Sequence, residues 1–318
     1  MGFELILPFL RPIEHLILDE EISEIMVNGS GRIFTERHGE MAEVPDAHLT
    51  EKNLQVAVRN IARALGDEIN EQQPLLDSRL PDGSRVAAVI PPCSIGGTTL
   101  TIRKFHSQQF AAEELVRIGS LAPELLEMLV AAIANRENIL ISGGTGTGKT
   151  TLLNALARFI PVSERILLIE DTAEIQLNHP NLVCFEARRE QPGIAPVTIR
   201  DLVRASLRHR PDRIILGEVR GGEAFDLLQA LNTGHSGSLS TIHANSASQT
   251  IARLTSCVLQ AGIELPYAAI RSEIAEGIQF ILHLERRRNC RIASELLRID
   301  RYDPAQDHYE LTTIYRRA

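Results

Sequence analysis

The sequence lacks several features that would place it outside the class of ordinary globular proteins. Tryptophan is absent, and aromatic residues make up 4% of the 318 residues. The four cysteines show neither the CxxC spacing of a zinc site nor the density of a disulfide framework; they are Cys93, Cys184, Cys257 and Cys290. They are typical of thiols in a reducing compartment.

Long apolar runs are also missing. No segment approaches the ~18 continuous apolar residues of a transmembrane helix, so the sequence predicts no membrane span. The first ten residues are apolar but are interrupted by Glu4 and Pro8, and they carry no basic leader, so we expect no signal peptide. We therefore expect a cytoplasmic protein.

Basic residues are fewer than acidic residues in this sequence. The chain has 33 Lys and Arg residues against 41 Asp and Glu residues, which gives a net charge of −8. Affinity for nucleic acid comes largely from basic side chains that neutralise phosphates. An acidic chain without a stripe of aromatic and basic residues is a poor candidate for direct nucleic-acid binding. The length is sufficient for two domains, each with its own core.

The first third of the chain predicts a small α+β domain over residues 1–105. An opening helix is followed by a strand meander, an amphipathic helix and two further strands, at 24–27, 32–36, 40–44, 54–65, 85–90 and 98–105. The polar stretch that follows has no periodic pattern and predicts a linker at 106–112.

The rest of the chain, residues 113–318, alternates between strand and helix patterns. Strands are predicted at 138–142, 165–170, 182–186, 213–217, 238–242 and 278–284. Helices are predicted at 121–135, 149–160, 198–209, 222–232, 246–261 and 266–276. This alternation predicts an α/β fold with a largely parallel sheet covered by helices on both faces. The tail, 290–316, predicts a closing strand pair.

A glycine-rich segment after the first of these strands carries the most specific signal. Residues 143–150 read GGTGTGKT and fit the phosphate-binding pattern G-x-x-x-x-G-K-[ST]. Glycines let the backbone turn its N–H groups toward phosphates, and the dipole of the following helix points the same way. The predicted nucleotide-binding residues of this loop are Gly143, Gly144, Thr145, Gly146, Thr147, Gly148, Lys149, Thr150 and Thr151.

Two side chains of the loop have defined roles in this pattern. Lys149 reaches the β and γ oxygens of the nucleotide, and the Thr150 hydroxyl ligates Mg²⁺. A glycine-rich surface turn is the alternative, and the flanking strand and helix disfavour it. The sequence therefore predicts that the chain binds ATP with Mg²⁺.

Hydrolysis needs further groups, and two later strands end in acidic residues, Glu170 and Glu218. Ligands of α/β sheets bind at these carboxyl ends. We assign Glu218 to a metal-bound water or to the attacking water, and Glu170 to polarising that water. The predicted catalytic residues are thus Glu218, Glu170 and Lys149, and the predicted metal ligands are Thr150 and Glu218. Each carboxylate alone is better explained as a helix cap or a solvated loop acid; their joint position behind a phosphate loop favours catalysis.

Four further side chains are candidates on weaker grounds. His235 and His243 lack further ligands at metal spacing. Both are candidates for sensing the γ-phosphate, with a structural histidine as the alternative. Arg85 and Arg103 lie in the N-terminal domain, where exposed arginines are usually solvated. If that domain folds over the nucleotide, they supply the transition-state charge of an arginine finger.

The order of these motifs resembles that of the type II/type IV secretion (traffic) ATPase superfamily, and within it the TrbB/CpaF-like branch. The matching stretches cover nearly the whole chain and are Gly83-Ser84-Arg85, 101–105, 143–151, 169–172, 210–213, 217–224, 232–235 and 241–246.

The resemblance implies a hexameric ring of two-domain subunits, with a RecA-like P-loop motor domain and nucleotide held between the domains. It implies that Arg85 and Arg103 approach the phosphates and that Glu218 is the Walker B glutamate. Type II members commonly carry a four-cysteine zinc insertion, which this sequence lacks, so the shorter conjugation-like or Tad-pilus-like branch is favoured.

We therefore expect a Mg²⁺-dependent ATPase that converts hydrolysis into domain motion in a homo-oligomeric ring. Its expected place is the inner face of the membrane, with inner-membrane components of a secretion, conjugation or pilus-assembly machine as partners. Two alternatives stay open: a switch that binds ATP without hydrolysing it, and a nucleic-acid translocase.

Overall fold

The computed structural model describes residues 3–317, apart from residues 30, 38, 46, 106–109, 189, 191–193 and 288–289. The chain divides into two compact units, unit 1 with residues 1–108 and unit 2 with residues 109–318. Each unit has its own hydrophobic core. The linker predicted at 106–112 begins with residues outside the described part, and helix α3 starts at Ala112.

Unit 1 opens in 3₁₀ turns rather than in the continuous helix that the sequence predicts. The turns are followed by a short helix, and together they span Phe3–Leu5, Leu7–Phe9, Arg11–Ile13 and α1 (Glu14–Leu18). Pro8 and Pro12 account for the interruption, because proline lacks the N–H that continues a helix and is tolerated only in a first turn.

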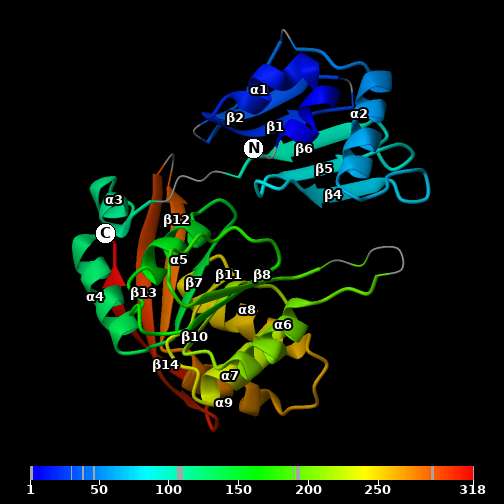
Figure 1. Ribbon diagram of the computed structural model, residues 1–318. Coiled ribbons are helices and arrows are strands. Elements are labelled where there is room, and N and C mark those ends of the chain that lie inside the picture. The colour runs from blue at the N-terminus through cyan, green and yellow to red at the C-terminus, as the bar shows by residue number, and fades with distance from the viewer. Residues whose placement is uncertain are drawn as a thin grey trace. The chain divides into compact units, whose positions relative to one another are not determined.

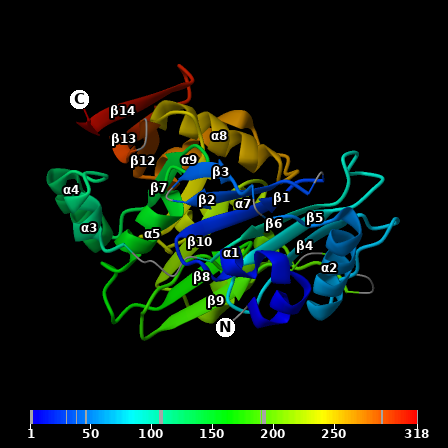
Figure 2. The ribbon, with the colours of Figure 1, turned by 90° about the horizontal axis from the view of Figure 1, so that it is seen from above.

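The rest of unit 1 is an antiparallel sheet with one long helix. Its elements are β1 (Ile22–Val27), β2 (Ile33–Arg37), β3 (Glu40–Glu43), α2 (Glu51–Ala64), β4 (Leu75–Arg79), β5 (Arg85–Val89) and β6 (Thr99–Arg103). The strands lie side by side in the order β3-β2-β1-β6-β5-β4 (Figure 2). The meander and the last two strands agree with the sequence prediction, whereas β4 was not predicted.

Alternation along the strands gives this sheet one apolar and one polar face. Ile25, Val86 and Ile102 are buried against α1, α2 and the opening turns. The residues between them, such as Glu24 and Arg103, point to the opposite face. α2 covers the apolar face because Leu54, Val58 and Ile61 recur at helical spacing.

Unit 2 alternates helices and strands as predicted (Figure 1). Its helices are α3 (Ala112–Arg117), α4 (Pro123–Ala134), α5 (Lys149–Ala157), α6 (Ile199–Ser206), α7 (Glu223–Asn232), α8 (Ala247–Leu259) and α9 (Tyr267–Gly277), with a 3₁₀ turn at Leu207–His209. Its strands are β7 (Ile139–Gly143), β8 (Ile166–Glu170), β9 (Leu182–Glu186), β10 (Arg213–Val219), β11 (Leu239–His243), β12 (Phe280–Arg287), β13 (Cys290–Asp303) and β14 (His308–Arg316).

The sheet of unit 2 has the strand order β14-β13-β12-β7-β11-β10-β8-β9. The strands from β12 to β9 are parallel, and β13 and β14 extend the sheet in antiparallel pairing, which is the closing strand pair that the tail predicts. Because the strands β7, β8, β10 and β11 are parallel, their carboxyl ends meet at one edge of the sheet.

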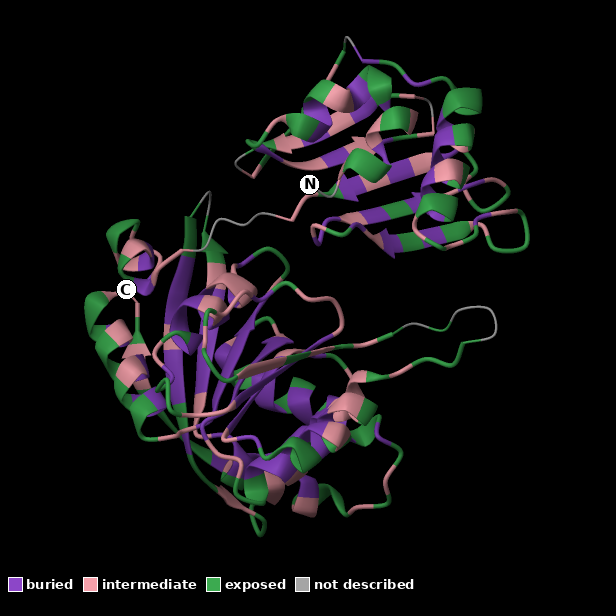
Figure 3. Ribbon diagram, in the orientation of Figure 1, coloured by how far each residue is buried: buried purple, intermediate pink, exposed green. Residues whose placement is uncertain are grey.

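Helices cover both faces of this sheet, as the alternation predicts. Helices α3, α4 and α5 pack on one face, and helices α6 to α9 pack on the other. The central strands are buried along most of their length (Figure 3). Their near-continuous apolar runs are typical of parallel strands buried on both faces. Among the described residues, no helix combines the length and apolar composition needed to cross a bilayer.

Candidate functional site

The phosphate loop joins the carboxyl end of β7 to the amino end of α5. β7 ends at Gly143 and α5 begins at Lys149. Gly148 has a φ of 91°, in the left-handed region that favours glycine, and it provides no side-chain cap for the helix. The N–H groups in the first turn of α5, which includes Thr150 and Thr151, can therefore donate to an anion.

Lys149 lies against the loop that precedes it. Its side-chain nitrogen donates to the carbonyl oxygens of Gly143 at 3.1 Å and Gly144 at 2.9 Å. The residue is buried, and burial lowers the pKa of the ammonium, an effect that the nearby charge of Glu218 opposes. The predicted phosphate ligand thus lies against the backbone of the loop.

Glu170, the last residue of β8, is a buried carboxyl group. Its Oε1 atom accepts hydrogen bonds from the backbone N–H groups of Glu174 at 2.9 Å and Ile175 at 3.0 Å. Burial raises the pKa of this carboxyl to about 7, although the two N–H donors counteract the rise. The neighbouring strand has Gly217 here, and a Cβ atom at that position would lie 3.0 Å from the Glu170 Cγ atom. Gly217 therefore makes room for the Glu170 side chain.

Glu218 lies on β10 beside this position and is fixed by an arginine. The Arg220 guanidinium donates to Glu218 Oε2 at 2.7 Å and to Asp171 Oδ2 at 3.1 Å, which ties the end of β10 to the end of β8. The other oxygen, Oε1, is buried and makes no hydrogen bond within the described residues. That atom has the capacity to accept a proton, a water or a cation.

His243, the last residue of β11, stands between Glu218 and the phosphate loop. Its Nε2 atom lies 2.9 Å from Glu218 Oε1, outside hydrogen-bond geometry, and both ring nitrogens lie 3.4 Å from the Lys149 nitrogen. Burial and the charge of Lys149 lower the pKa of His243, and the charge of Glu218 opposes this effect. The structure thus brings together Lys149, His243, Glu218 and Glu170 at one edge of the sheet.

The structure does not bring His235 to this group. His235 follows α7 and precedes β11, so the length of β11 separates it from His243. Its imidazole Nδ1 lies 3.2 Å from the carbonyl oxygen of Ala230, at the end of α7. Among the described residues this contact fits a structural histidine, and phosphate sensing by His235 stays a prediction.

Arg85 and Arg103 lie side by side in unit 1. They are in register on the antiparallel strands β5 and β6. The Arg85 guanidinium lies 3.7 Å from Asp77 Oδ1, and the charge of Arg103 acts on Glu24, across the next strand pair. Like charges directly opposite one another destabilise a sheet. Asp77 and Glu24 offset this repulsion, and the role of the arginine pair at the nucleotide stays a prediction.

Among the described residues, two cavities on either side of the phosphate loop bear on its chemistry. The first, of about 80 Å³, has mainly apolar walls, and we call it the apolar cavity. Phe110, Leu121 and Ile292 contribute to its walls, together with Arg291. Thr147, Gly148 and Thr151 of the loop and helix α5 also line it.

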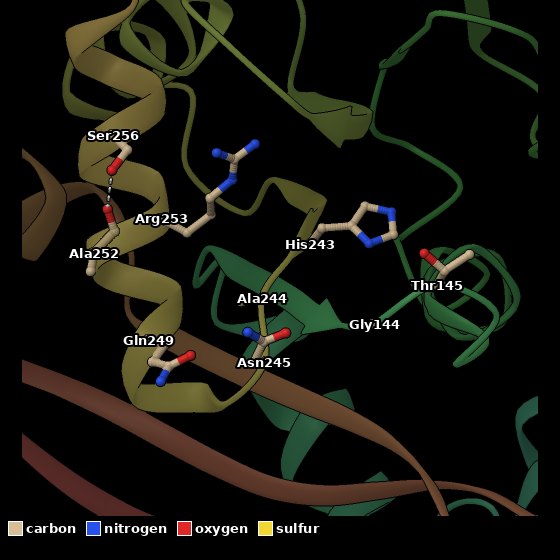
Figure 4. A pocket seen from close by; sticks show the side chains of 9 residues that line it. All are labelled: Gly144, Thr145, His243, Ala244, Asn245, Gln249, Ala252, Arg253 and Ser256. Carbon is tan, nitrogen blue, oxygen red and sulfur yellow. Dashed lines mark hydrogen bonds between the residues drawn. The ribbon is translucent and has the colours of Figure 1, made fainter.

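The second cavity, of about 470 Å³, lies between the loop and α8, and we call it the polar cavity. It is lined by Gly144 and Thr145 of the loop, by His243 and by polar side chains of the segment that follows β11, chiefly Asn245, Gln249 and Arg253 (Figure 4). Figure 4 shows Arg253 leaving α8 on the side that faces His243.

Sequence reasoning missed Arg220 and Arg253. A signal for Arg220 was present, because a residue two positions after Glu218 on a strand points to the same face. For Arg253 the signal was weaker. Gln249, Arg253 and Ser256 recur at helical spacing, a pattern that usually marks a solvated helix face.

Comparison with known proteins places this geometry in a family. A family model described as "Type II/IV secretion system protein" matches residues 9–312. The conjugal transfer protein TrbB of Rhizobium radiobacter is 35% identical over 296 residues, which cover 92% of this chain and 87% of TrbB.

Solved structures agree with this match. The VirB11 ATPase from the Brucella suis type IV secretion system, solved in complex with sulphate, is 31% identical with a TM-score of 0.50 and covers 92% of this chain and 94% of its own. The Legionella pneumophila ATPase DotB is 22% identical with a TM-score of 0.65 and covers 93% of this chain and 84% of its own, which shows a shared fold.

Proposed function

Because the chain belongs to the type II/IV secretion system protein family, we propose that it is a Mg²⁺-dependent ATPase of a secretion, conjugation or pilus-assembly machine. One observation carries the proposal: a phosphate loop, two glutamate side chains and an imidazole meet at the carboxyl edge of one parallel sheet. In open α/β sheets this edge is where ligands bind.

The phosphate loop would hold the β and γ phosphates of ATP. Its backbone N–H groups and the first turn of α5 donate to the phosphate oxygens, and Lys149 exchanges its two carbonyl partners for them. The sulphate in the VirB11 structure is an anion of the same tetrahedral shape. The apolar cavity continues from Thr147, Gly148 and Thr151 and is suited to the flat nucleobase, with Arg291 available to stack on it.

The residues present also fit a magnesium ion. Mg²⁺ usually keeps waters and binds through one or two carboxylates together with substrate phosphates. Among the described residues, no cluster of three or more His, Cys, Asp or Glu side chains forms a preassembled metal site. Thr150 and the Glu218 Oε1 atom, which lacks a hydrogen bond, would hold the ion together with the nucleotide. Bound there, the ion would neutralise charge that develops on the phosphate oxygens.

The two carboxyl groups would have different roles toward the attacking water. Glu218, held by Arg220, orients the water, and His243 is close enough to report on the state of the γ-phosphate. Glu170, with a pKa of about 7, is suited to accept a proton near neutral pH. Its Oε1 atom is fixed by two backbone donors, so the carboxyl group has a defined orientation.

Hydrolysis would drive domain motion in a hexameric ring at the inner face of the membrane. We propose residues 1–105 as the N-terminal domain, 106–112 as the linker, and 113–318 as the motor domain. Arg85 and Arg103 would supply transition-state charge, as the family resemblance implies. Membrane components of the machine would be the partners, and we propose no direct contact with nucleic acid.

The test compares Lys149→Ala with the parent protein. Each charge-assisted hydrogen bond contributes about 1.5–3 kcal/mol, so affinity for ATP should fall about tenfold or more, and phosphate release should become undetectable. Calorimetry with Mg²⁺ and a slowly hydrolysed ATP analogue measures binding, and a steady-state assay measures phosphate release.

Lys52→Ala is the matched control, because Lys52 is exposed on α2. It should bind and hydrolyse ATP like the parent. Parent-rate hydrolysis by Lys149→Ala would show that the loop is not the reaction site. Binding without hydrolysis by the parent protein would instead favour the ATP-dependent switch.

A further inference from the structure

The polar cavity beside α8 holds chemistry that nucleotide binding does not use. Gln249, Arg253 and Ser256 line it from successive turns of α8, and Asn245 lines it from the segment before that helix (Figure 4). The cavity opens directly onto Gly144 and Thr145 of the phosphate loop and onto His243. It is therefore continuous with the end of the loop where the γ-phosphate would lie.

Arg253 is the charged group of this cavity. Other arginines of unit 2 are paired with carboxylates: Arg200 and Arg204 with Asp226, and Arg213 with Glu164. Among the described residues, Arg253 forms no ion pair. Its hydrogen bond is a long one, from Nη2 to the carbonyl oxygen of Arg220 at 3.4 Å.

No acidic residue lines the polar cavity within the described part of the chain. Glu218, behind His243, has one oxygen bound by Arg220. The positive charge of Arg253 reaches the neighbouring imidazole, where it is one of the causes that lower the pKa of His243. The Ser256 hydroxyl donates to the carbonyl oxygen of Ala252. The cavity thus presents a guanidinium and two amide side chains to any molecule that enters it, and it favours an anion.

We propose that this cavity binds inorganic phosphate, the product of hydrolysis, on its way out of the site. The inference rests on the proposed ATPase activity. Water attacks the γ-phosphorus and gives a proton to Glu170, the bond to the β,γ-bridging oxygen breaks, and ADP keeps that oxygen, so the free product is orthophosphate. ADP still occupies the loop and blocks departure on that side, whereas the polar cavity lies open beside Gly144, Thr145 and His243.

Arg253 is the specificity-determining residue of this phosphate site. Its planar guanidinium matches two oxygens of a tetrahedral anion, and the Asn245 and Gln249 amides supply further donors. A site of this kind holds the product briefly after cleavage, so ADP and phosphate would leave in a set order. In many enzymes product release, rather than the chemical step, limits the rate of turnover.

Two measurements on the full chain test the proposal, each comparing the parent with Arg253→Ala. In the first, inorganic phosphate is titrated into protein saturated with Mg²⁺ and ADP, and its uptake is followed by equilibrium dialysis. Loss of the guanidinium should weaken phosphate binding about tenfold, or about 1.4 kcal/mol, while the affinity for ADP stays unchanged.

The second measurement is a single turnover of ATP. Acid quenching reports cleavage, and a phosphate sensor in solution reports release. The parent should release phosphate with a delay after cleavage, and Arg253→Ala should shorten that delay. The single-turnover measurement follows phosphate that is formed on the protein, whereas the equilibrium dialysis follows phosphate that the protein takes up from solution.

Arg208→Ala is the matched control, because Arg208 is an exposed arginine of unit 2 in the turn before β10. It should behave like the parent in both measurements. The proposal is wrong if ADP-loaded parent protein takes up no phosphate at millimolar concentrations, or if Arg253→Ala matches the parent in either measurement. Failure of the parent to bind ADP would instead overturn the proposed function itself.

Discussion

The two cavities beside the phosphate loop differ in the chemistry of their walls. The apolar cavity is lined by side chains such as Phe110, Leu121 and Ile292. The polar cavity is lined by His243, Asn245 and Arg253, among others. One loop separates them, since Thr147 and Gly148 belong to the first cavity and Gly144 and Thr145 to the second.

Because of this difference, we expect the apolar cavity to contribute to nucleotide affinity and the polar cavity to contribute to the hydrolysis reaction. An apolar cavity gains free energy from any nucleobase that it covers, so it binds ATP and ADP alike. The polar cavity and its neighbours His243 and Glu218 meet the part of the nucleotide that changes during hydrolysis. Substitutions on the apolar side should therefore change affinity, and substitutions on the polar side should change turnover.

The largest expected effect comes from Glu218→Gln, on the side of the polar cavity. The amide has nearly the shape of the carboxylate but lacks its charge and basicity. Turnover should fall about 10²-fold to 10⁴-fold, the range for loss of a general acid–base group, while nucleotide affinity stays within a few-fold of the parent. Single-turnover hydrolysis and calorimetry measure the two quantities separately.

Glu276→Gln is the control for this variant, because Glu276 is exposed on α9. It should leave both quantities unchanged. A Glu218→Gln protein that hydrolyses ATP at the parent rate would remove the catalytic assignment and with it the contrast between the two sides.

Glu170 extends the comparison, because it is the most buried acid at the sheet edge. Its folded pKa of about 7 exceeds the ordinary value of 4.5, so the folded protein binds more protons than the unfolded chain between these pH values. Stability is therefore full below pH 4.5 and falls on the order of 3 kcal/mol as the pH rises through 7. Turnover should rise over the same range as the carboxylate forms.

Glu170→Gln should remove this pH dependence of stability. Its unfolding free energy relative to the parent should rise between pH 4.5 and 7, as measured by urea unfolding with circular dichroism. Glu127→Gln, an exposed position on α4, should keep the parent profile. An unchanged difference between Glu170→Gln and the parent across this range would show that the carboxyl titrates normally.

The sequence predicted the fold of unit 2 because each pattern that indicates a strand, a turn or a helix lies within a short segment of the chain. The buried strand β7 is a continuous apolar run, the loop glycines end it, and α5 follows at once. The α/β fold class and the resemblance to TrbB-like secretion ATPases are both confirmed by the relatives and solved structures. Strand β4 and helix α3 escaped prediction. β4 reads Leu-Leu-Asp-Ser-Arg over Leu75–Arg79, without the alternation of polar and apolar residues that predicts a strand, and α3 spans only Ala112–Arg117.

The site was predictable as far as each residue lies in a recognisable motif. The contact of Lys149 with His243 was not predictable, because it depends on the pairing of β7 with β11, whose paired residues, such as Gly143 and His243, are 100 positions apart in the sequence. The burial that raises the pKa of Glu170 depends on Gly217 of a neighbouring strand. Such effects arise from sheet order and packing, which no local pattern records.

The smallest expected effect belongs to the apolar cavity. Phe110→Ala removes a ring that is only partly buried against the core of unit 2, so the fold should tolerate the change. Loss of part of an aromatic contact costs about 1 kcal/mol, so affinity should fall about fivefold for ATP and ADP alike. The maximal rate at saturating ATP should stay at the parent value, because none of the proposed catalytic residues lines the apolar cavity.

Val162→Ala is the matched control, since Val162 is 73% exposed and does not line either cavity. Calorimetry with ADP and with an ATP analogue measures how far Phe110→Ala lowers the affinity for each nucleotide relative to the parent. An equal loss for the two nucleotides supports a cavity that covers only what they share. A loss confined to ATP, or a lower maximal rate, would place Phe110 with the reacting groups and contradict the division between affinity and chemistry.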